Sequence, residues 1–167
     1  RKDPTQIVLK YMEWCQDYKE DRITILYDTM WEGTRALADE MARAIQEASP
    51  STTVVSHCLS KFDKNDALTD VFRSKAILVG SPTINKGILT AVAGTLEEMK
   101  GLKFKGKKAA AFGCYGWSGE SVKLIGDALK EAGFEVVDEG LRALWNPDSD
   151  ALAAARDYGK AFAAKVK

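Results

Sequence analysis

The stretch that decides the fold is Ile23-Thr24-Ile25-Leu26-Tyr27-Asp28-Thr29-Met30-Trp31-Glu32-Gly33-Thr34-Arg35-Ala36-Leu37-Ala38. Its first five residues are apolar or β-branched, which is typical of a buried strand. From Ala36 onward the apolar residues recur at helical spacing, at Leu37, Met41 and Ala44. The stretch therefore predicts a strand, a tight loop and a helix in succession.

The loop of this stretch is predicted to bind a phosphate group. The first N–H groups of a helix have no partner within the helix, and the helix dipole adds partial positive charge there. An anion is the natural ligand of such a helix start, and the hydroxyl groups of Thr29 and Thr34 add two donors. The alternative is an ordinary connection in which Thr34 is only the helix N-cap.

The composition limits the possible partners. The chain has 167 residues, which suits one domain, and its 24 basic and 24 acidic residues balance. This balance argues against nucleic acid, whose phosphates require a surplus of Lys and Arg. No apolar run approaches the roughly 20 residues of a membrane span. Cys15, Cys58 and Cys114 are far apart and odd in number, so we expect no disulfide framework and a reducing, cytoplasmic location.

The only histidine, His57, restricts the chemistry further. A Ser-His-Asp triad would have to use it, and a multi-histidine metal centre cannot be built from this chain. His57 lies within a predicted strand, and we expect it to be structural. The sequence therefore predicts no catalytic residue and no metal ligand.

Strands and helices alternate along the whole chain, which predicts a parallel sheet covered by helices on both faces. Gly140 is a candidate bulge in the last strand, and Asp66 is a candidate cap of the third helix. The expected strands are Arg22–Asp28, Thr52–Leu59, Ala76–Gly80, Ala109–Gly113 and Phe134–Trp145. The expected helices are Thr5–Tyr18, Gly33–Ala48, Asp66–Phe72, Ile88–Met99, Glu120–Ala132 and a last one after Asp148.

Three loops are expected at the carboxyl edge of this sheet, where ligands of such folds bind. They are Asp28–Thr34, Ser81–Gly87 and Cys114–Gly119. In the third loop Tyr115 and Trp117 offer flat side chains that can stack on a ring, and the glycines let the backbone approach it. Together the loops predict a planar aromatic ligand that carries a phosphate.

Three other patterns come close to known motifs and fail. The run Gly101–Lys107 spells most of a Walker A loop, but Lys108 replaces the required Ser or Thr and the run precedes a strand. The glycines between Gly113 and Gly119 have the wrong spacing for a dinucleotide fingerprint. Ser118 lacks both the second glycine of a nucleophile elbow and a downstream histidine.

Three stretches resemble the flavodoxin family and, more narrowly, the flavin domain of flavodiiron proteins, which are oxygen and nitric oxide reductases. They are Tyr27–Met30, Gly80–Asn85 and Phe112–Gly119. The resemblance implies an α/β fold, a flavodoxin-like doubly wound five-stranded parallel sheet of order 2-1-3-4-5. It also implies a linker helix from an absent upstream domain at residues 1–21 and an FMN-binding domain at 22–167.

The resemblance implies FMN as the cofactor. The first loop would wrap the phosphate, the second and third would lie along the two sides of the isoalloxazine ring, and Trp117 would stack on it. Short-chain flavodoxins carry other residues where Trp31 and Glu32 stand, so we expect the Glu32 carboxylate to point to water or to pair with Arg35. The implied cofactor-binding residues are Thr29, Met30, Trp31, Glu32, Gly33, Thr34, Ser81, Pro82, Thr83, Ile84, Asn85, Cys114, Tyr115, Gly116, Trp117, Ser118 and Gly119.

The resemblance further implies electron transfer from a rubredoxin-like donor to a di-iron centre. That centre would sit in a metallo-β-lactamase-like domain of a parent protein that is a homo-oligomer. This chain would then be an electron-transfer module of an oxidoreductase, without a nucleic-acid or membrane partner.

Two alternatives on similar folds stay open. One is a stand-alone NAD(P)H:quinone-type reductase that uses the same loops. The other is a receiver-type signalling domain phosphorylated on Asp28, although no acidic neighbour stands beside Asp28 in the sequence.

Overall fold

The computed structural model describes residues 3–166. Residues 1 and 2 of the expected linker and residue 167 of the expected FMN-binding domain lie outside the described part. The strands are β1 (Glu20–Tyr27), β2 (Thr53–Cys58), β3 (Ser74–Gly80), β4 (Lys108–Tyr115), β5 (Glu135–Val136) and β6 (Leu141–Leu144). The helices are α1 (Thr5–Trp14), α2 (Gly33–Ala48), α3 (Lys64–Arg73), α4 (Thr90–Leu102), α5 (Glu120–Glu131) and α6 (Ser149–Lys165).

The sheet has the predicted order, β2-β1-β3-β4-β5, and all its strand pairs are parallel. The ends of the three central strands are in register, because Tyr27 pairs with Gly80 and Gly80 pairs with Phe112. The loops that follow β1, β3 and β4 therefore leave the sheet at one edge, as the sequence predicts.

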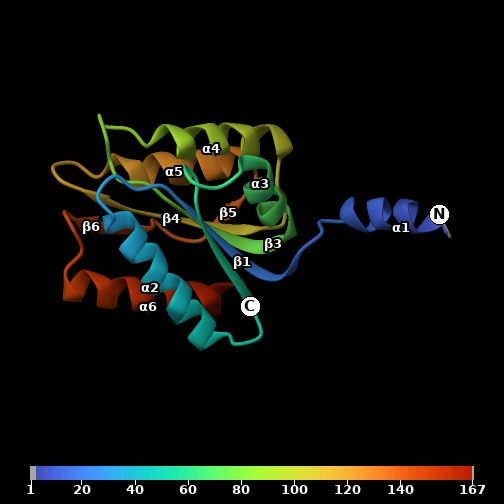
Figure 1. The fold of residues 1–167 in the computed structure, drawn as a ribbon, viewed down its shortest axis with the longest axis horizontal. Coiled ribbons are helices and arrows are strands. Elements are labelled where there is room, and N and C mark those ends of the chain that lie inside the picture. The colour runs from blue at the N-terminus through green and yellow to red at the C-terminus, as the bar shows by residue number, and fades with distance from the viewer. Residues whose placement is uncertain (1–2, 167) are drawn as a thin grey trace.

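Helices cover both faces of the sheet (Figure 1). On one face α2 and α6 pack against β1, β3 and β4 through a cluster that includes Leu37, Met41 and Phe162. On the other face α3, α4 and α5 pack through a cluster that includes Leu96, Met99 and Ile125. The continuous apolar run of β3 is buried on both faces, which explains why it shows no alternation of polar residues.

The fifth position of the sheet differs from its prediction. Instead of one strand over Phe134–Trp145, two short strands pair with β4, β5 at its start and β6 at its end. Gly140 lies between them with a φ of +85°, and its N–H donates to Asp138 Oδ1 at 2.9 Å. This left-handed turn interrupts the ladder, and it leaves Trp145 beyond the end of β6.

One smaller prediction, the cap of α3, is wrong, and the alternative that made Thr34 the cap of α2 does not hold either. The cap of α3 is Asp63 rather than Asp66, because Asp63 Oδ1 accepts the N–H groups of Asn65 and Asp66. The N-cap position of α2 is Glu32 rather than Thr34. In both cases the cap lies two or three residues before its predicted position, within the usual uncertainty of helix ends.

Helix α1 stands away from the sheet at the end opposite the loops (Figure 1). None of its residues is buried, and Ile7, Leu9 and Tyr11 are more than half exposed. No described helix is long and apolar enough to span a membrane.

Candidate functional site

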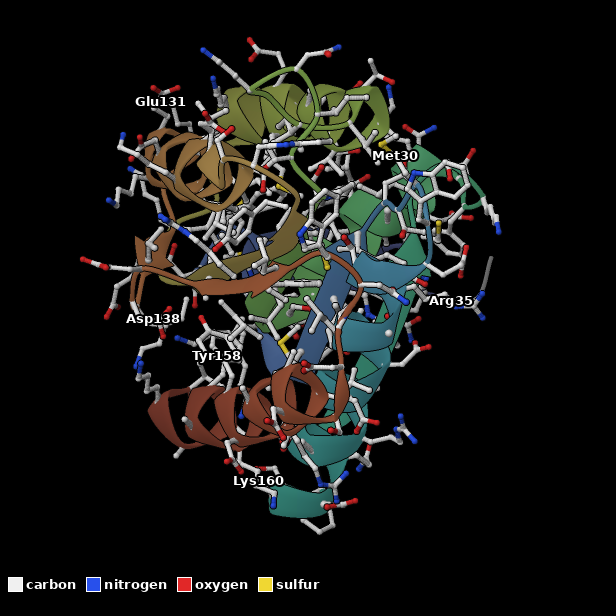
Figure 2. The ribbon with its side chains drawn as sticks, turned by 90° about the vertical axis from the view of Figure 1, so that its left-hand side faces the viewer. Met30, Arg35, Glu131, Asp138, Tyr158 and Lys160 are labelled. Atoms are coloured by element: carbon white, nitrogen blue, oxygen red, sulfur yellow. The ribbon has the colours of Figure 1, made fainter. Side chains whose placement is uncertain are left out.

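A cavity of about 430 Å³ opens at the carboxyl edge of the sheet. This volume lies within the usual range of small-molecule sites. Figure 2 views the molecule from this end, with Met30 and Arg35 on one side and Asp138 and Tyr158 on the other. The cavity is lined by Thr29, Met30, Trp31, Gly33, Thr34, Pro82, Thr83, Cys114, Tyr115, Gly116, Trp117, Trp145 and Asn146.

The start of α2 leaves donors without partners at one end of this cavity. The first helical hydrogen bond runs from Ala36 N to Glu32 O at 2.9 Å, so the N–H groups just before Ala36 precede the helical ladder. The hydroxyl oxygens of Thr29 and Thr34 are buried and have no hydrogen-bond partner within the described residues. Buried hydroxyls are nearly always paired, so these two are available to bond a polar ligand in the cavity.

The carboxylate of Glu32 is exposed and paired with a cation. Its backbone is left-handed, with a φ of +62°, and its carboxylate lies 3.1 Å from the Arg35 guanidinium. Both side chains are about half exposed or more. The predicted pairing of Glu32 with Arg35 is confirmed, and the pair keeps a free carboxylate from facing an anion.

The second loop contributes Pro82 and Thr83 to the cavity wall. Thr83 is held in place because its N–H donates to Cys114 O at 2.8 Å and its hydroxyl donates to Ser121 Oγ at 3.0 Å. The neighbouring Ser81 is fully buried, and its hydroxyl accepts the N–H of Leu89 at 3.0 Å. Ser81 therefore shapes the loop and does not line the cavity.

The tip of the second loop is a tight turn. The N–H of Gly87 donates to Ile84 O at 2.7 Å, and the N–H of Ile84 donates back to Gly87 O at 3.2 Å. Asn85 and Lys86 occupy the turn with φ values of +51° and +57°, the pattern of a type I′ turn. Asn85 and Ile84 are outside the lining of the cavity.

The third loop supplies the aromatic wall. Tyr115 and Trp117 both line the cavity, and Trp117 is 89 % exposed. Burial raises the pKa of the Cys114 thiol, while the nearby Thr34 hydroxyl acts in the opposite direction. Cys114 is therefore a neutral, apolar part of the floor at pH 7.

Two lining residues were not predicted, Trp145 and Asn146 from the loop after β6. A Cβ atom on Gly33 would lie 3.1 Å from Pro147 Cδ and 3.3 Å from Asn146 Oδ1, so this fourth loop packs against the start of α2. The sequence carried a usable signal, because the last strand of a parallel sheet must also end at the loop edge.

The structure thus brings most predicted site residues together and leaves some just outside. Those that do not line the cavity are Glu32, Ser81, Ile84, Asn85, Ser118 and Gly119. For the residues inside and outside the lining alike, contact with a cofactor stays a prediction.

Asp28, the candidate phosphorylation site of the receiver alternative, is buried, and its carboxylate accepts hydrogen bonds from neighbouring residues. Its Oδ1 accepts the N–H of Thr29 at 2.9 Å and the hydroxyl of Ser60 at 2.8 Å, and the Cys58 thiol lies 3.6 Å away. This carboxylate stabilises the loop and is not presented to a phosphate donor.

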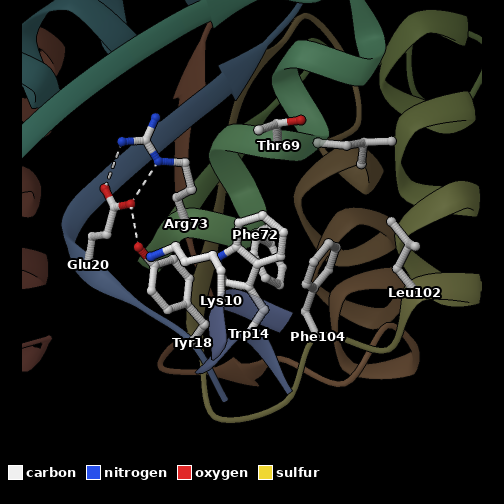
Figure 3. Close-up of a pocket in the computed structure, with 10 residues that line it drawn as sticks. Lys10, Trp14, Tyr18, Glu20, Thr69, Phe72, Arg73, Leu102 and Phe104 are labelled. Carbon is white, nitrogen blue, oxygen red and sulfur yellow. Dashed lines mark hydrogen bonds and ion pairs between the residues drawn. The ribbon is translucent and has the colours of Figure 1, made fainter. Parts of the chain in front are cut away.

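A second, more apolar groove of about 640 Å³ lies at the opposite edge, between α1 and the body of the domain (Figure 3). Trp14, Phe72 and Phe104 are among its lining residues. Its polar groups are already paired, since Glu20 accepts bonds from Arg73 at 2.8 and 3.0 Å. Among the residues that the structure describes, none that lines this groove has an unpartnered buried donor like those of the cavity at the loop edge.

The flavodoxin family matches residues 25–159 of the chain. Among curated proteins, the chain is 50% identical to the anaerobic nitric oxide reductase flavorubredoxin of Aeromonas hydrophila over 163 residues, 98% of this chain and 33% of that protein. The chain spans about a third of the length of the curated relatives it matches.

Two solved structures share the fold. Rubredoxin oxygen:oxidoreductase from Desulfovibrio gigas superposes with a TM-score of 0.91 at 30% identity, over 97% of this chain and 40% of that one. A flavodoxin from the domain Archaea superposes with a TM-score of 0.75 at 30% identity, over 87% of this chain and 98% of that one.

Proposed function

This chain belongs to the flavodoxin family and is an FMN-binding electron-transfer domain, and from that premise we propose that it serves as the flavin module of a flavodiiron reductase. In that role it passes electrons from a rubredoxin-like donor to a di-iron centre outside this chain. The similarity to a flavorubredoxin and to a rubredoxin oxygen:oxidoreductase supports the assignment. The homo-oligomeric state of the parent stays a prediction.

The observation that carries the proposal is the pair of buried, unpartnered hydroxyls of Thr29 and Thr34 at the start of α2. A phosphate dianion would accept bonds from both, together with the free N–H groups of the helix start. The aromatic residues Tyr115 and Trp117 stand along the same cavity, at the place where a ring joined to that phosphate would lie. The residues present therefore fit FMN.

When bound, FMN supplies a ring that takes up and releases electrons. The chain's own residues bind the phosphate, orient the ring and cover part of it. Thr29 and Thr34 would fix the phosphate end, and Trp117 would cover a face of the ring while leaving an edge open to a redox partner.

A comparison of FMN with riboflavin tests this division of roles. Both ligands are titrated into the apo-chain by flavin fluorescence, and wild type is expected to bind FMN far more tightly, because riboflavin lacks the phosphate. Thr34→Val is expected to weaken the binding of FMN about tenfold or more without affecting the binding of riboflavin. Trp117→Ala is expected to weaken the binding of both ligands. The control is Thr69→Val on α3, whose hydroxyl bonds only to Asn65 O of its own helix. Equal affinity of wild type for the two flavins would contradict the proposal.

We also propose that α1 belongs to the connection with another domain of the parent protein, within the linker expected at residues 1–21. Its exposed apolar residues, Ile7, Leu9 and Met12 among them, support this, because apolar side chains gathered on one helix are typical of an interaction surface. Hydrogen exchange of α1 is expected to be slow in the full-length parent and fast in this chain. Equally fast exchange in both proteins would contradict the linker role.

For the compartment we propose the cytoplasm, as the cysteines suggest. Cys15, Cys58 and Cys114 are all free thiols. Alkylation of the freshly isolated protein under denaturing conditions is expected to label all three, whereas a protected pair would argue for an oxidising compartment.

A further inference from the structure

Trp145, in the fourth loop of the site, has a backbone conformation that tryptophan rarely adopts. Its φ is +56°, in the left-handed region that favours glycine and asparagine. The conformation is held because its N–H donates to Tyr115 O at 2.7 Å, which extends the pairing of β6 with β4 by one residue. Strained residues of this kind persist where the surroundings fix them, and they gather at functional sites.

The indole of Trp145 lies over the third loop. A Cβ atom on Gly116 would come within 3.0 Å of Trp145 Cζ3 and 3.2 Å of Cη2, so the absence of a side chain at Gly116 makes room for the ring. Gly116 is thus needed for close approach of the two loops. The contact places the ring of Trp145 directly beside the next residue, Trp117.

Trp117 and Trp145 form an edge-to-face pair. Their ring centroids lie 5.0 Å apart with an angle of 71° between the planes. Because Trp117 is 89 % exposed, it has little other packing to hold its side chain in one rotamer. An exposed tryptophan without such a contact would sample several rotamers, and a ligand would have to order it on binding.

We propose that Trp145 is a positioning residue of the flavin site, which acts by holding Trp117 in the orientation that meets the flavin ring. The inference rests on the proposed function, since it concerns the same cavity. Trp145 reduces the ordering that binding requires, and it sets the geometry with which the Trp117 ring faces the ligand.

The test uses FMN titration of the apo-chain in wild type, Trp145→Gly, Trp145→Phe, Trp117→Ala and the double variant Trp145→Gly/Trp117→Ala. Glycine adopts the left-handed conformation freely, so Trp145→Gly removes the ring without adding backbone strain. We expect Trp145→Gly to weaken the binding of FMN about five- to tenfold. We expect Trp145→Phe to retain most of the wild-type affinity. We expect the double variant to bind as Trp117→Ala does, within about twofold.

A second readout separates positioning from general destabilisation. The visible circular dichroism and the residual fluorescence of bound flavin, measured at saturation, report the stacking geometry. Trp145→Gly is expected to change both even when all sites are filled. The matched control is Leu144→Ala, because Leu144 is the preceding residue, is 55 % exposed and does not line the cavity. It is expected to leave both signals at their wild-type values.

The outcomes distinguish this inference from the function on which it rests. If wild type binds no FMN, the proposed function fails. If wild type binds FMN and Trp145→Gly matches it in affinity and dichroism, only the role of Trp145 is overturned. If the losses from Trp145→Gly and Trp117→Ala multiply in the double variant, Trp145 acts independently of Trp117, and the positioning role is likewise overturned.

Discussion

The carboxylate of Glu32 lies 3.1 Å from the guanidinium of Arg35, one helical turn away at the start of α2. Arg35 also lies 3.6 Å from Asp39 Oδ2, so one guanidinium balances part of the charge of two carboxylates near the proposed phosphate site. Arg35→Met would leave the Glu32 charge unpaired, and we expect the dissociation constant of FMN to rise about two- to fivefold at low ionic strength. Riboflavin binding should not change, and 0.5 M salt should reduce the effect.

The double variant Glu32→Gln/Arg35→Met shows whether the pair acts as described. Removing both charges is expected to return the FMN dissociation constant to near its wild-type value. If the double variant binds FMN as weakly as Arg35→Met, then Arg35 itself contacts the phosphate and the shielding role is refuted.

Gly113 is the position in β4 that should tolerate no side chain. A Cβ atom there would lie 2.0 Å from Ser81 O, a backbone atom that cannot move without displacing the second loop. Gly113→Ala is expected to lower the free energy of unfolding by more than about 2 kcal/mol, measured by urea denaturation. The control is Gly94→Ala in α4, where nothing lies within 4 Å of the new methyl group. It is expected to stabilise the chain by about 0.5–1 kcal/mol.

Asp138 fixes α6 to the interrupted fifth strand. It accepts hydrogen bonds from Tyr158 Oη at 2.5 Å and Gly140 N at 2.9 Å, and it pairs with Lys165 at 2.7 Å. Burial opposes its ionisation, but the bonds from Lys165, Tyr158 and Gly140 outweigh burial and hold its pKa below the usual value. Its stabilising contribution is therefore present above the unfolded-state pKa of about 3.9 and is lost as the pH falls through the folded-state value.

Removal of one partner tests this account. Tyr158→Phe is expected to cost about 2 kcal/mol of unfolding free energy near pH 7, since it removes a bond to a charged acceptor. The difference between wild type and Tyr158→Phe should shrink below about pH 4, where Asp138 becomes protonated in the unfolded chain. A difference that stays constant from pH 7 to pH 2 would show that the carboxylate is not involved.

Lys107, the lysine of the Walker-like run, is a structural residue at the edge opposite the cavity. Its buried ammonium group donates to the carbonyl oxygens of Tyr18, Phe72 and Ser74 at 2.6–2.8 Å. Lys107→Met would remove the donor from one buried and two partly buried carbonyl acceptors, and we expect a loss of about 2–3 kcal/mol in unfolding free energy at pH 7. Urea denaturation measures this loss. An unchanged unfolding free energy would contradict the structural role of the three hydrogen bonds from Lys107.

The pH dependence of Lys107 has a definite sign. Burial lowers its pKa to about 8 in the folded chain, against about 10.4 in the unfolded chain. Between these values the unfolded chain binds more protons, so this group makes stability rise with pH in that window. The free energy of unfolding of wild type relative to Lys107→Met should therefore increase from pH 7.5 to pH 10. A difference that falls over this range would contradict the lowered pKa.

Local patterns predicted most of the fold. The apolar run of β3 and the switch from strand to helix after Tyr27 are written in consecutive residues, so periodicity is sufficient to find them. The strand order came from the resemblance to a known family, because nothing local says which strands are neighbours. The exposure of α1 could not be predicted, since an apolar stripe does not reveal whether a packing partner belongs to the same chain.

The site was predicted where loops directly follow strands and was missed where the strand pattern was misleading. Apolar residues at both ends of 134–145 favour one long strand, so the sequence predicted at most a bulge at Gly140 and placed Trp145 inside the sheet. The bond from Gly140 N–H to Asp138 within the turn is local, but the contact of Asp138 with Tyr158 spans 20 residues and cannot be seen in a local window. The same limit applies to the pairing of Trp117 with Trp145.

The interruption between β5 and β6 also affects how the folded chain meets other chains. The two outer strands of the sheet are β2 on one side and the broken fifth position on the other. The edge formed by β5 and β6 is a poor template for an added strand, because the turn at Gly140 between them interrupts the row of backbone N–H and C=O groups. The six-residue β2 has no such break, so we expect any strand that adds to this sheet to pair with the free edge of β2.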